Sequence, residues 1–298
     1  MLDPRRLLTF REVARHGSFS RAAEALARSQ PAVSHQVGAL ERELGTALLV
    51  RGRAGAVLTP AGALLLTHAD AVAARLALAD TQMDALVAGE RRTLTVGGFP
   101  SALATIVPAA AAVLRARDPD LAVAVEEGTV DALALGVHAG RLDVAVGWQD
   151  AALARREHDG LRRVDLHEEP MVAVLGAGHR LAHRKRIALA DLASEPWMAP
   201  KRDGLLLRAC RAAGFEPRIV ILTRDPLAAR AIAAAGLAVS LTPRLLAAIP
   251  LPGIVTPALG SGAPRRTLYA LLPPAGAHPM AIAFVEEVRA AARGNAAL

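Results

Sequence analysis

The side chains best suited to chemistry stand at the start of a predicted helix that runs from Gln30 to Leu44. An apolar stripe with helical spacing marks the inner face of this helix: Val33, Val37, Leu40 and Leu44. The residues around its first turn are small, polar and uncharged, and such a helix start can enter a groove of DNA and hydrogen-bond to base edges and phosphates. The candidate DNA contacts are Ser29, Gln30, Pro31, Ala32, Ser34, His35 and Gln36.

A second predicted helix, from Ser18 to Ala27, positions the first one, because only a very short turn separates the two patterns. Ser18 and Ser29 can each accept a hydrogen bond from an N–H of the following first turn, and Gly45 suits the left-handed position after a helix. The spacing predicts a helix-turn-helix whose second helix reads DNA. The alternative is a helical hairpin inside an ordinary bundle.

Residues 50 to 58 are predicted to form a short hairpin wing beside this unit. Arg51 and Arg53 are set among glycines at its tip, where they can lie against the DNA backbone or enter the minor groove. The alternative is a solvated loop.

These motifs resemble the amino-terminal domain of LysR-type transcriptional regulators. The resemblance is carried by Ser18-Phe19-Ser20-Arg21-Ala22-Ala23, Ser29-Gln30-Pro31-Ala32-Val33-Ser34, Leu40-Glu41, Leu44-Gly45 and Leu58-Thr59-Pro60-Ala61-Gly62, and it covers about the first sixty residues. Leu49 stands where the family usually has Phe, and His35 where Arg is commoner. A neutral His is a poorer partner for an anion than Arg, so one contact to phosphate or base is weakened.

Charge and length agree with a DNA-binding front end. The chain has 298 residues, of which 53% are hydrophobic, and a net charge of +7, so it can form two or three domains. Residues 1 to 60 contain nine Arg and five acidic residues, a net +4. One fifth of the chain therefore carries more than half of the excess positive charge, which indicates a polyanion-binding surface there.

Several other classes lack support in the sequence. The single cysteine, Cys210, excludes an internal disulfide and is predicted to be a packed small residue, and no zinc-type Cys/His spacing occurs. Neither a signal peptide nor an apolar run of membrane-spanning length is recognisable. We therefore expect a reduced, cytoplasmic protein that has no membrane contact, no cofactor and no metal.

A long helix is predicted from Pro60 to about Gly89, with Thr59 as its cap. Its apolar residues alternate four and three apart, as in a coiled coil: Leu65, Ala69, Val72, Leu76, Ala79, Met83 and Leu86. A single helix cannot bury such a stripe against itself, so we expect a homodimer or homotetramer that presents two recognition helices to an inverted repeat. The alternative is packing against the chain's own carboxyl-terminal domain.

Strands and helices alternate from residue 93 onward, which predicts parallel sheets flanked by helices. The predicted strands are 93–97, 122–127, 144–147, 164–175, one at Trp197, 219–222, 237–241 and 267–272. The predicted helices are 100–117, 130–139, 204–213, 225–235 and 279–293, and residues 245–264 are predicted to be mostly loop.

The resemblance extends more loosely into this region, through Arg141-Leu142-Asp143-Val144-Ala145-Val146-Gly147, Leu192-Ala193-Ser194-Glu195-Pro196-Trp197 and Ala234-Ala235-Gly236-Leu237-Ala238-Val239-Ser240-Leu241. It implies a multidomain α+β and α/β protein: a winged helix-turn-helix (1–59), a linker and dimerisation helix (60–89), and a periplasmic-binding-protein-like effector domain (90–298). The effector domain would contain subdomain one (93–164 plus 267–294), subdomain two (165–266) and a ligand cleft between them.

Open α/β sheets bind ligands where strands end, so the residues that follow the predicted strands are candidates for contacts to an effector. Ser101 and Thr129 begin helices, whose first amides suit an anion, and Trp148 could stack on a ligand. The candidates are Phe99, Pro100, Ser101, Thr129, Trp148, Gln149, Lys201, Arg202 and Thr223. They motivate the expectation of a small anionic effector, such as a carboxylate.

Two further patterns in the sequence do not indicate a binding site. Gly176-Ala177-Gly178 lacks the third glycine of a dinucleotide motif. His179 and His183 are four residues apart, but the neighbouring Arg and Lys residues would repel a metal ion. No nucleophile elbow or paired carboxylate indicates an enzyme.

The sequence thus predicts a regulator whose partners are double-stranded DNA, a small-molecule effector, further copies of itself and RNA polymerase. The alternative is a solute-binding or catalytic α/β protein whose first helices serve only oligomerisation.

Overall fold

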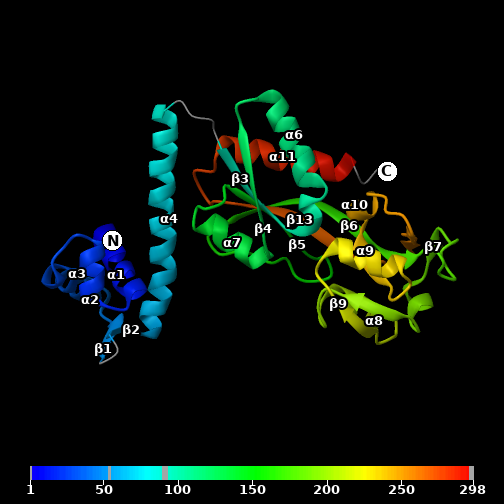
Figure 1. Cartoon of the computed structure of the whole chain (residues 1–298), viewed down its shortest axis with the longest axis horizontal. Coiled ribbons are helices and arrows are strands. Elements are labelled where there is room, and N and C mark those ends of the chain that lie inside the picture. Colours follow the sequence, from blue (N-terminus) through cyan, green and yellow to red (C-terminus); the bar gives the residue numbers. More distant parts are fainter. Residues whose placement is uncertain (1, 53–54, 89–92, 295–298) are drawn as a thin grey trace. The chain divides into compact units, whose positions relative to one another are not determined.

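A computed structural model of the chain describes residues 2–52, 55–88 and 93–294 (Figure 1). The chain divides into two compact units. The first contains residues 1–90 with the short segment 138–141, and the second contains residues 91–137 and 142–298. The predicted winged helix-turn-helix and the predicted α/β fold are both present, one in each unit.

The first unit is a winged helix-turn-helix followed by a long helix. Its elements are α1 (Pro4–His16), α2 (Phe19–Ala25), α3 (Gln30–Leu44), β1 (Leu49–Gly52), β2 (Gly55–Leu58) and α4 (Pro60–Ala88). Val33, Val37 and Leu40 of α3 are buried against Phe10 and Val13 of α1, so the apolar stripe predicted from the sequence forms the core of this unit. Strands β1 and β2 pair as an antiparallel hairpin.

Serine side chains cap the two helices of the motif as predicted. Ser18 Oγ accepts from the Arg21 N–H and Ser29 Oγ from the Ala32 N–H, each at 3.4 Å. Gly45 ends α3 in the left-handed conformation. Ala27, between the helices, also has a positive φ of 51°, which is unfavourable for a residue with a Cβ.

The apolar stripe of α4 is divided between two environments. Leu65 packs against the core of the winged domain and Ala69 is fully buried, while Arg11 Nε donates to Asp70 Oδ1 at 2.6 Å. Farther along the helix, Leu76 and Met83 are 47% and 57% exposed. The first part of the predicted seam therefore belongs to the fold of the first unit, whereas Leu76 and Met83 of the later part are about half exposed.

The second unit is built on a mixed sheet with the strand order β4-β3-β5-β13-β6-β12-β7. Strands β10 and β11 also pair with β6, and β8 pairs separately with β9. The strands are β3 (Thr93–Gly98), β4 (Ala122–Glu127), β5 (Val144–Asp150), β6 (Arg162–Gly176), β7 (Arg186–Ile187), β8 (Pro196–Ala199), β9 (Arg218–Leu222), β10 (Ser240–Pro243), β11 (Ile254–Val255), β12 (Ala258–Leu259) and β13 (Arg265–Leu272). The helices are α5 (Pro100–Leu103), α6 (Ile106–Arg117), α7 (Val130–His138), the 3-10 helix η1 (Leu189–Leu192), α8 (Leu205–Ala212), α9 (Pro226–Ala234), α10 (Arg244–Ala247) and α11 (Pro279–Gly294).

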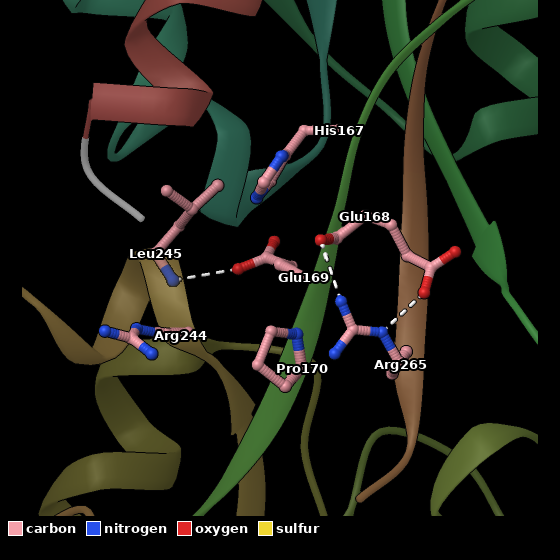
Figure 2. A pocket seen from close by; sticks show the side chains of 7 residues that line it. All are labelled: His167, Glu168, Glu169, Pro170, Arg244, Leu245 and Arg265. Atoms are coloured by element: carbon pink, nitrogen blue, oxygen red, sulfur yellow. Dashed lines mark hydrogen bonds and ion pairs between the residues drawn. The ribbon is translucent and has the colours of Figure 1, made fainter. Parts of the chain in front are cut away.

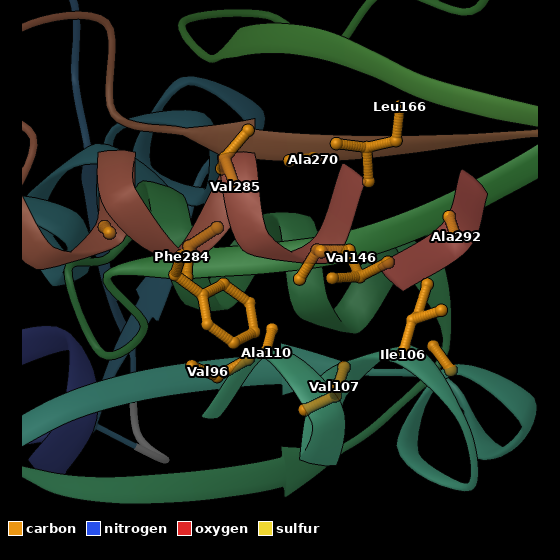
Figure 3. Close-up of a cluster of buried hydrophobic side chains, with 14 of the residues drawn as sticks. Val96, Ile106, Val107, Ala110, Val146, Leu166, Ala270, Phe284, Val285 and Ala292 are labelled. Carbon is orange, nitrogen blue, oxygen red and sulfur yellow. The ribbon is translucent and has the colours of Figure 1, made fainter. Parts of the chain in front are cut away.

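Strand β6 divides the second unit into two lobes. Its first part pairs with β13 and its last part with β10 and β11, so that one continuous strand serves both. We call β3, β4, β5, β13, α5, α6, α7 and α11 the first lobe, and β7 to β12 with α8, α9 and α10 the second lobe. The core of the first lobe lies between its sheet and the helices α6 and α11, where Phe284 packs among Val96, Val107 and Val146 (Figure 3). Trp197 anchors the core of the second lobe.

Three predicted elements differ from the structure. The helix predicted over 100–117 is broken at Ala104 and Thr105, because Pro108 would clash with the carbonyl group of Ala104 in a continuous helix. The strand predicted at 237–241 lies at Ser240–Pro243. The predicted loop 245–264 contains most of α10 and the short strands β11 and β12.

Candidate nucleic-acid interface and effector site

The first turn of α3 faces outward. Gln30, Pro31, Ala32 and His35 are exposed, whereas Val33 next to them is completely buried. The serine cap at Ser29 and the proline at the helix start fix where this turn begins. The sequence-predicted contacts therefore form one short exposed surface, which small polar side chains make suitable for close approach to a groove.

Two of the predicted contacts lie at the margin of this surface. Ser34 and Gln36 are partly buried, and Gln36 Oε1 is enclosed without a hydrogen-bond partner among the described residues. An enclosed amide oxygen without a partner is unfavourable.

The wing is held by a small network at the end of α3. Glu41 Oε1 accepts from the backbone N–H groups of Leu48 and Leu49 at 2.8 and 3.2 Å. Thr59 Oγ1 donates to the carbonyl of Ala47 at 2.8 Å and accepts from the Gly62 N–H at 3.0 Å, which caps α4. These contacts explain why Leu40-Glu41 and Leu58-Thr59-Pro60-Ala61-Gly62 occur as motifs: together they join the recognition helix, the wing and α4.

The two wing arginines remain predictions. Arg51 lies in β1, opposite Ala56 in the ladder. Arg53 lies outside the described residues, so the structure does not place the tip of the wing.

In the second unit, three of the predicted effector residues gather around a residue that the sequence analysis missed, Arg266 of β13. Its Nη1 donates to Ser101 Oγ at 3.1 Å. Its guanidinium carbon lies 5.1 Å from the centroid of the Phe99 ring and 5.8 Å from that of Trp148. The two rings meet edge to face, with centroids 6.5 Å apart.

A buried carboxylate compensates the charge of Arg266. Nε and Nη2 of Arg266 donate to Glu169 Oε1 at 2.8 and 2.6 Å, and the side chains are only 6% and 1% exposed. Glu169 Oε2 accepts from the Leu245 N–H at 2.8 Å. Burial lowers the pKa of Arg266, and Glu169 opposes that effect. In the sequence, Glu169 lies within the predicted strand 164–175 and Arg266 borders the predicted strand 267–272, which places both at the sheet but does not show that they pair.

The other predicted effector residues are engaged elsewhere. Gln149 Oε1 accepts from the Arg156 N–H at 2.9 Å and so holds the loop after β5. Thr129 caps α7 through the Ala132 N–H at 3.3 Å, and Thr223 Oγ1 accepts from the Asp225 N–H at 3.2 Å. Lys201 lies 3.3 Å from Asp203. The remaining two, Pro100 at the start of α5 and the exposed Arg202, lie beside these groups in the chain.

The anion-binding role predicted for the helix after β3 is weakened by its length. Helix α5 has only four residues, because of the break before Pro108, and its aligned peptide dipoles are correspondingly few. The cationic group beside Phe99 and Ser101 is therefore the Arg266 guanidinium, whose charge Glu169 compensates, rather than a helix start.

A cavity of about 250 Å³ opens where β6 and β13 pass α10 (Figure 2). It is lined by His167, Glu168, Glu169, Pro170, Arg244, Leu245 and Arg265. Burial lowers the pKa of His167, so this histidine favours its neutral form. The Glu169 carboxylate faces this cavity and also contacts Arg266, so the cavity and the Phe99–Trp148 cluster share one buried residue.

The other side chains that could take part in redox or metal chemistry are Cys210, His179 and His183. Cys210 is completely buried in the core of the second lobe, as predicted, and burial raises its pKa to about 12. His179 Nε2 lies 3.2 Å from Glu195, while His183 is exposed. The described part of the chain contains no group of three or more His, Cys, Asp or Glu side chains placed to hold a metal ion. None of its helices is long and apolar enough to cross a membrane.

Comparison with known proteins identifies both units. Residues 4–63 match the family described as bacterial regulatory helix-turn-helix protein, lysR family, and residues 88–293 match the LysR substrate binding domain. The chain belongs to the LysR family. Members of this family are transcriptional regulators and not enzymes, so the solute-binding or catalytic alternative is wrong.

Individual LysR proteins are similar along most of the chain. The Hca operon transcriptional activator HcaR of Escherichia coli is 32% identical over 248 residues, 81% of this chain and 82% of HcaR. The regulator TfdS of Cupriavidus pinatubonensis is 31% identical over 268 residues, which are 86% of this chain and 87% of TfdS. The structure of the LysR regulator CbnR with its target DNA is 26% identical, with a TM-score of 0.62 over 97% of this chain and 100% of CbnR. The chain is thus similar to these LysR regulators along most of its length.

Proposed function

We propose that this LysR regulator acts in the cytoplasm, where it binds an inverted-repeat operator as a homo-oligomer and alters transcription when a small organic anion binds its second unit. When it is bound to the operator, the regulator also contacts RNA polymerase. The observation that carries it is the first turn of α3, which is exposed at Gln30, Pro31 and His35 while the stripe behind it is buried.

The oligomeric state is supported by α4. Leu76 and Met83 are large apolar side chains that remain about half exposed, and they follow the part of α4 that packs on the winged domain. A second copy of α4 would cover them and would place two recognition helices on two half-sites. Replacing both residues by Asp should lower the mass measured by light scattering to that of a monomer. Leu227→Asp, at a leucine of α9 that is 63% exposed, should leave the mass unchanged.

The effector is supported by the cluster around Arg266. Two aromatic rings, a serine hydroxyl and a guanidinium group lie together at the carboxyl ends of β3 and β5, and an aromatic carboxylate or a similar small anion would match them. Calorimetric titration of the full chain with small carboxylates and with the corresponding amides tests this. Preference for the amides would overturn the anionic assignment and leave the DNA-binding proposal intact.

DNA binding is tested by fluorescence anisotropy with duplexes from the region upstream of the protein's own gene, alongside a shuffled duplex. We expect an affinity for one site that falls steeply with salt, by about 0.9 in the log–log slope for each phosphate contact. Gln30→Ala should reduce the preference for that site over the shuffled duplex. A protein that stays monomeric and ignores duplex DNA at low ionic strength would overturn the proposal.

A further inference from the structure

One ion pair joins the two lobes of the second unit away from the strands that connect them. Asp150 is the last residue of β5 in the first lobe, and Arg208 lies on α8 in the second lobe. Nε and Nη2 of Arg208 donate to the same carboxylate oxygen, Asp150 Oδ2, at 2.8 and 2.6 Å. The pair can exist only while α8 stays against the end of β5.

The two partners differ in their exposure to water. The Asp150 side chain is 6% exposed and the Arg208 side chain is 44% exposed. The other Asp150 oxygen accepts from the Ala152 N–H at 3.0 Å, so the carboxylate is fully satisfied only when Arg208 is present. If the lobes separated, Arg208 could turn to water at little cost, but Asp150 would have to be hydrated or remain as an uncompensated buried charge.

The position of Asp150 connects this pair with the effector cluster. Asp150 follows Trp148 by two residues and lies opposite Arg266 in the β5–β13 ladder. Trp148 and Arg266 are two members of the cluster around which we place the effector. A ligand that shifts either residue therefore acts on the strand end that carries Asp150.

We propose that Asp150 and Arg208 form a latch that holds the two lobes together in this conformation and is released when the lobes reorient. Its regulatory meaning rests on the proposed effector response. The latch itself is measurable without effector or DNA, so its failure and the failure of the proposed function are distinguishable.

Helix α8 offers a matched control. Arg211 lies three residues after Arg208 on the same helix and pairs with Glu216 at 2.8 Å, within the second lobe. Both side chains are about 60% exposed. Arg211→Gln therefore removes the same charge from the same helix without touching the contact between the lobes.

The experiment measures the distance between the lobes by pulsed electron spin resonance on the full-length protein. Nitroxide labels are attached to Leu135→Cys on α7 and Leu227→Cys on α9, which are 60% and 63% exposed. Cys210 is buried and burial raises its pKa to about 12, so it reacts poorly with the label. Dilution with unlabelled protein removes distances between copies.

With Arg208 present, we expect one narrow distance distribution. Arg208→Gln should add a second population and raise the ratio of open to closed molecules by about three- to tenfold, as expected for the loss of a partly exposed charged hydrogen-bond pair. Asp150→Asn should act in the same direction, and the double variant should add little to either single variant. Arg208→Lys should restore most of the closed population.

Arg211→Gln should give the distribution of the unmodified protein. Identical distributions for the unmodified protein and Arg208→Gln would overturn the latch, and so would full additivity of Asp150→Asn and Arg208→Gln. If Asp150→Asn does not fold, the comparison of Gln, Lys and Arg at position 208 with Gln at position 211 decides the matter, since these positions are at the surface.

Discussion

The backbone of Gly62 lies directly against the carbonyl group of Leu48: a Cβ at position 62 would stand 2.1 Å from the Leu48 oxygen. Because that carbonyl group also accepts from the Thr59 N–H at 3.0 Å, it cannot move aside without breaking this hydrogen bond at the start of α4. Only glycine lets α4 start this close to the segment that leads into the wing.

We therefore expect Gly62→Ala to destabilise the first unit by about 2 kcal/mol or more, as overpacking against fixed backbone does. Gly38→Ala is the control, because a Cβ at position 38 meets only the end of the Arg42 side chain at 3.8 Å. In a helix interior that change should stabilise by about 0.5–1 kcal/mol. Thermal unfolding followed by circular dichroism measures both effects. Equal midpoints for Gly62→Ala and the unmodified protein would contradict the close contact.

The strained turn between α2 and α3 gives the opposite prediction. Ala27 has a φ of 51°, so Ala27→Gly should relieve strain and stabilise the first unit by about 0.5–1 kcal/mol, net of the greater freedom of glycine in the unfolded chain. Ala63→Gly, at an exposed position in α4, should instead destabilise it by about 1 kcal/mol. Chemical denaturation of the two variants distinguishes the signs, and destabilisation by Ala27→Gly would contradict the expectation.

His35 is exposed in the first turn of α3, where the family more often has Arg. His35→Arg should therefore add one contact to DNA and make the log–log salt slope steeper by about 0.9. His183→Arg makes the same chemical change at an exposed position of the second unit and serves as the control. An unchanged slope for His35→Arg would indicate that this face of α3 does not approach the phosphates.

The buried pair of Arg266 and Glu169 predicts strong non-additivity. Arg266→Met leaves a carboxylate that is 1% exposed without its cation and should cost about 3–5 kcal/mol. Adding Glu169→Gln removes that charge and should recover much of the loss. Tryptophan fluorescence is a suitable probe, because both tryptophans, Trp148 and Trp197, lie in the second unit. Additive losses would show that the pair does not act as a unit.

His158 predicts a pH dependence of stability. Its Nε2 lies 3.0 Å from the Tyr269 hydroxyl, and its pKa is lowered by burial and by the neighbouring Arg156 and Arg163. The unfolded chain therefore binds a proton more readily than the folded chain, so stability should fall as the pH drops below about 6.5. His158→Gln should reduce the difference in urea midpoint between pH 7.5 and 5.5, whereas His183→Gln at an exposed site should not.

The elements of the first unit were predictable from the sequence, because the signals that mark them are local. Serine caps, Gly45 and the stripe from Val33 to Leu40 determine their own helices, and the structure contains all of them. The division of the α4 stripe was not predictable in this way. Whether Leu65 or Leu76 packs on the chain itself depends on how near α1 lies to each, which is a tertiary property.

The candidate effector site was only partly predictable for the same reason. Phe99, Ser101 and Trp148 follow predicted strands, and the structure brings them together. Arg266 and Glu169 reach the same place from β13 and β6, 97 residues apart in the sequence, and only strand pairing shows that they meet. Asp150 and Arg208 are 58 residues apart and lie on different elements, β5 and α8, so no local sequence pattern predicts that they pair.

Strand β6 runs unbroken through both lobes, pairing with β13 along its first part and with β10 along its last. If either lobe unfolded, the other would lose β6, a strand on which its own sheet depends. The two lobes should therefore unfold together in a single transition, although their cores are separate. For the same reason, neither lobe could be excised as a self-sufficient fragment by cutting anywhere within residues 162–176.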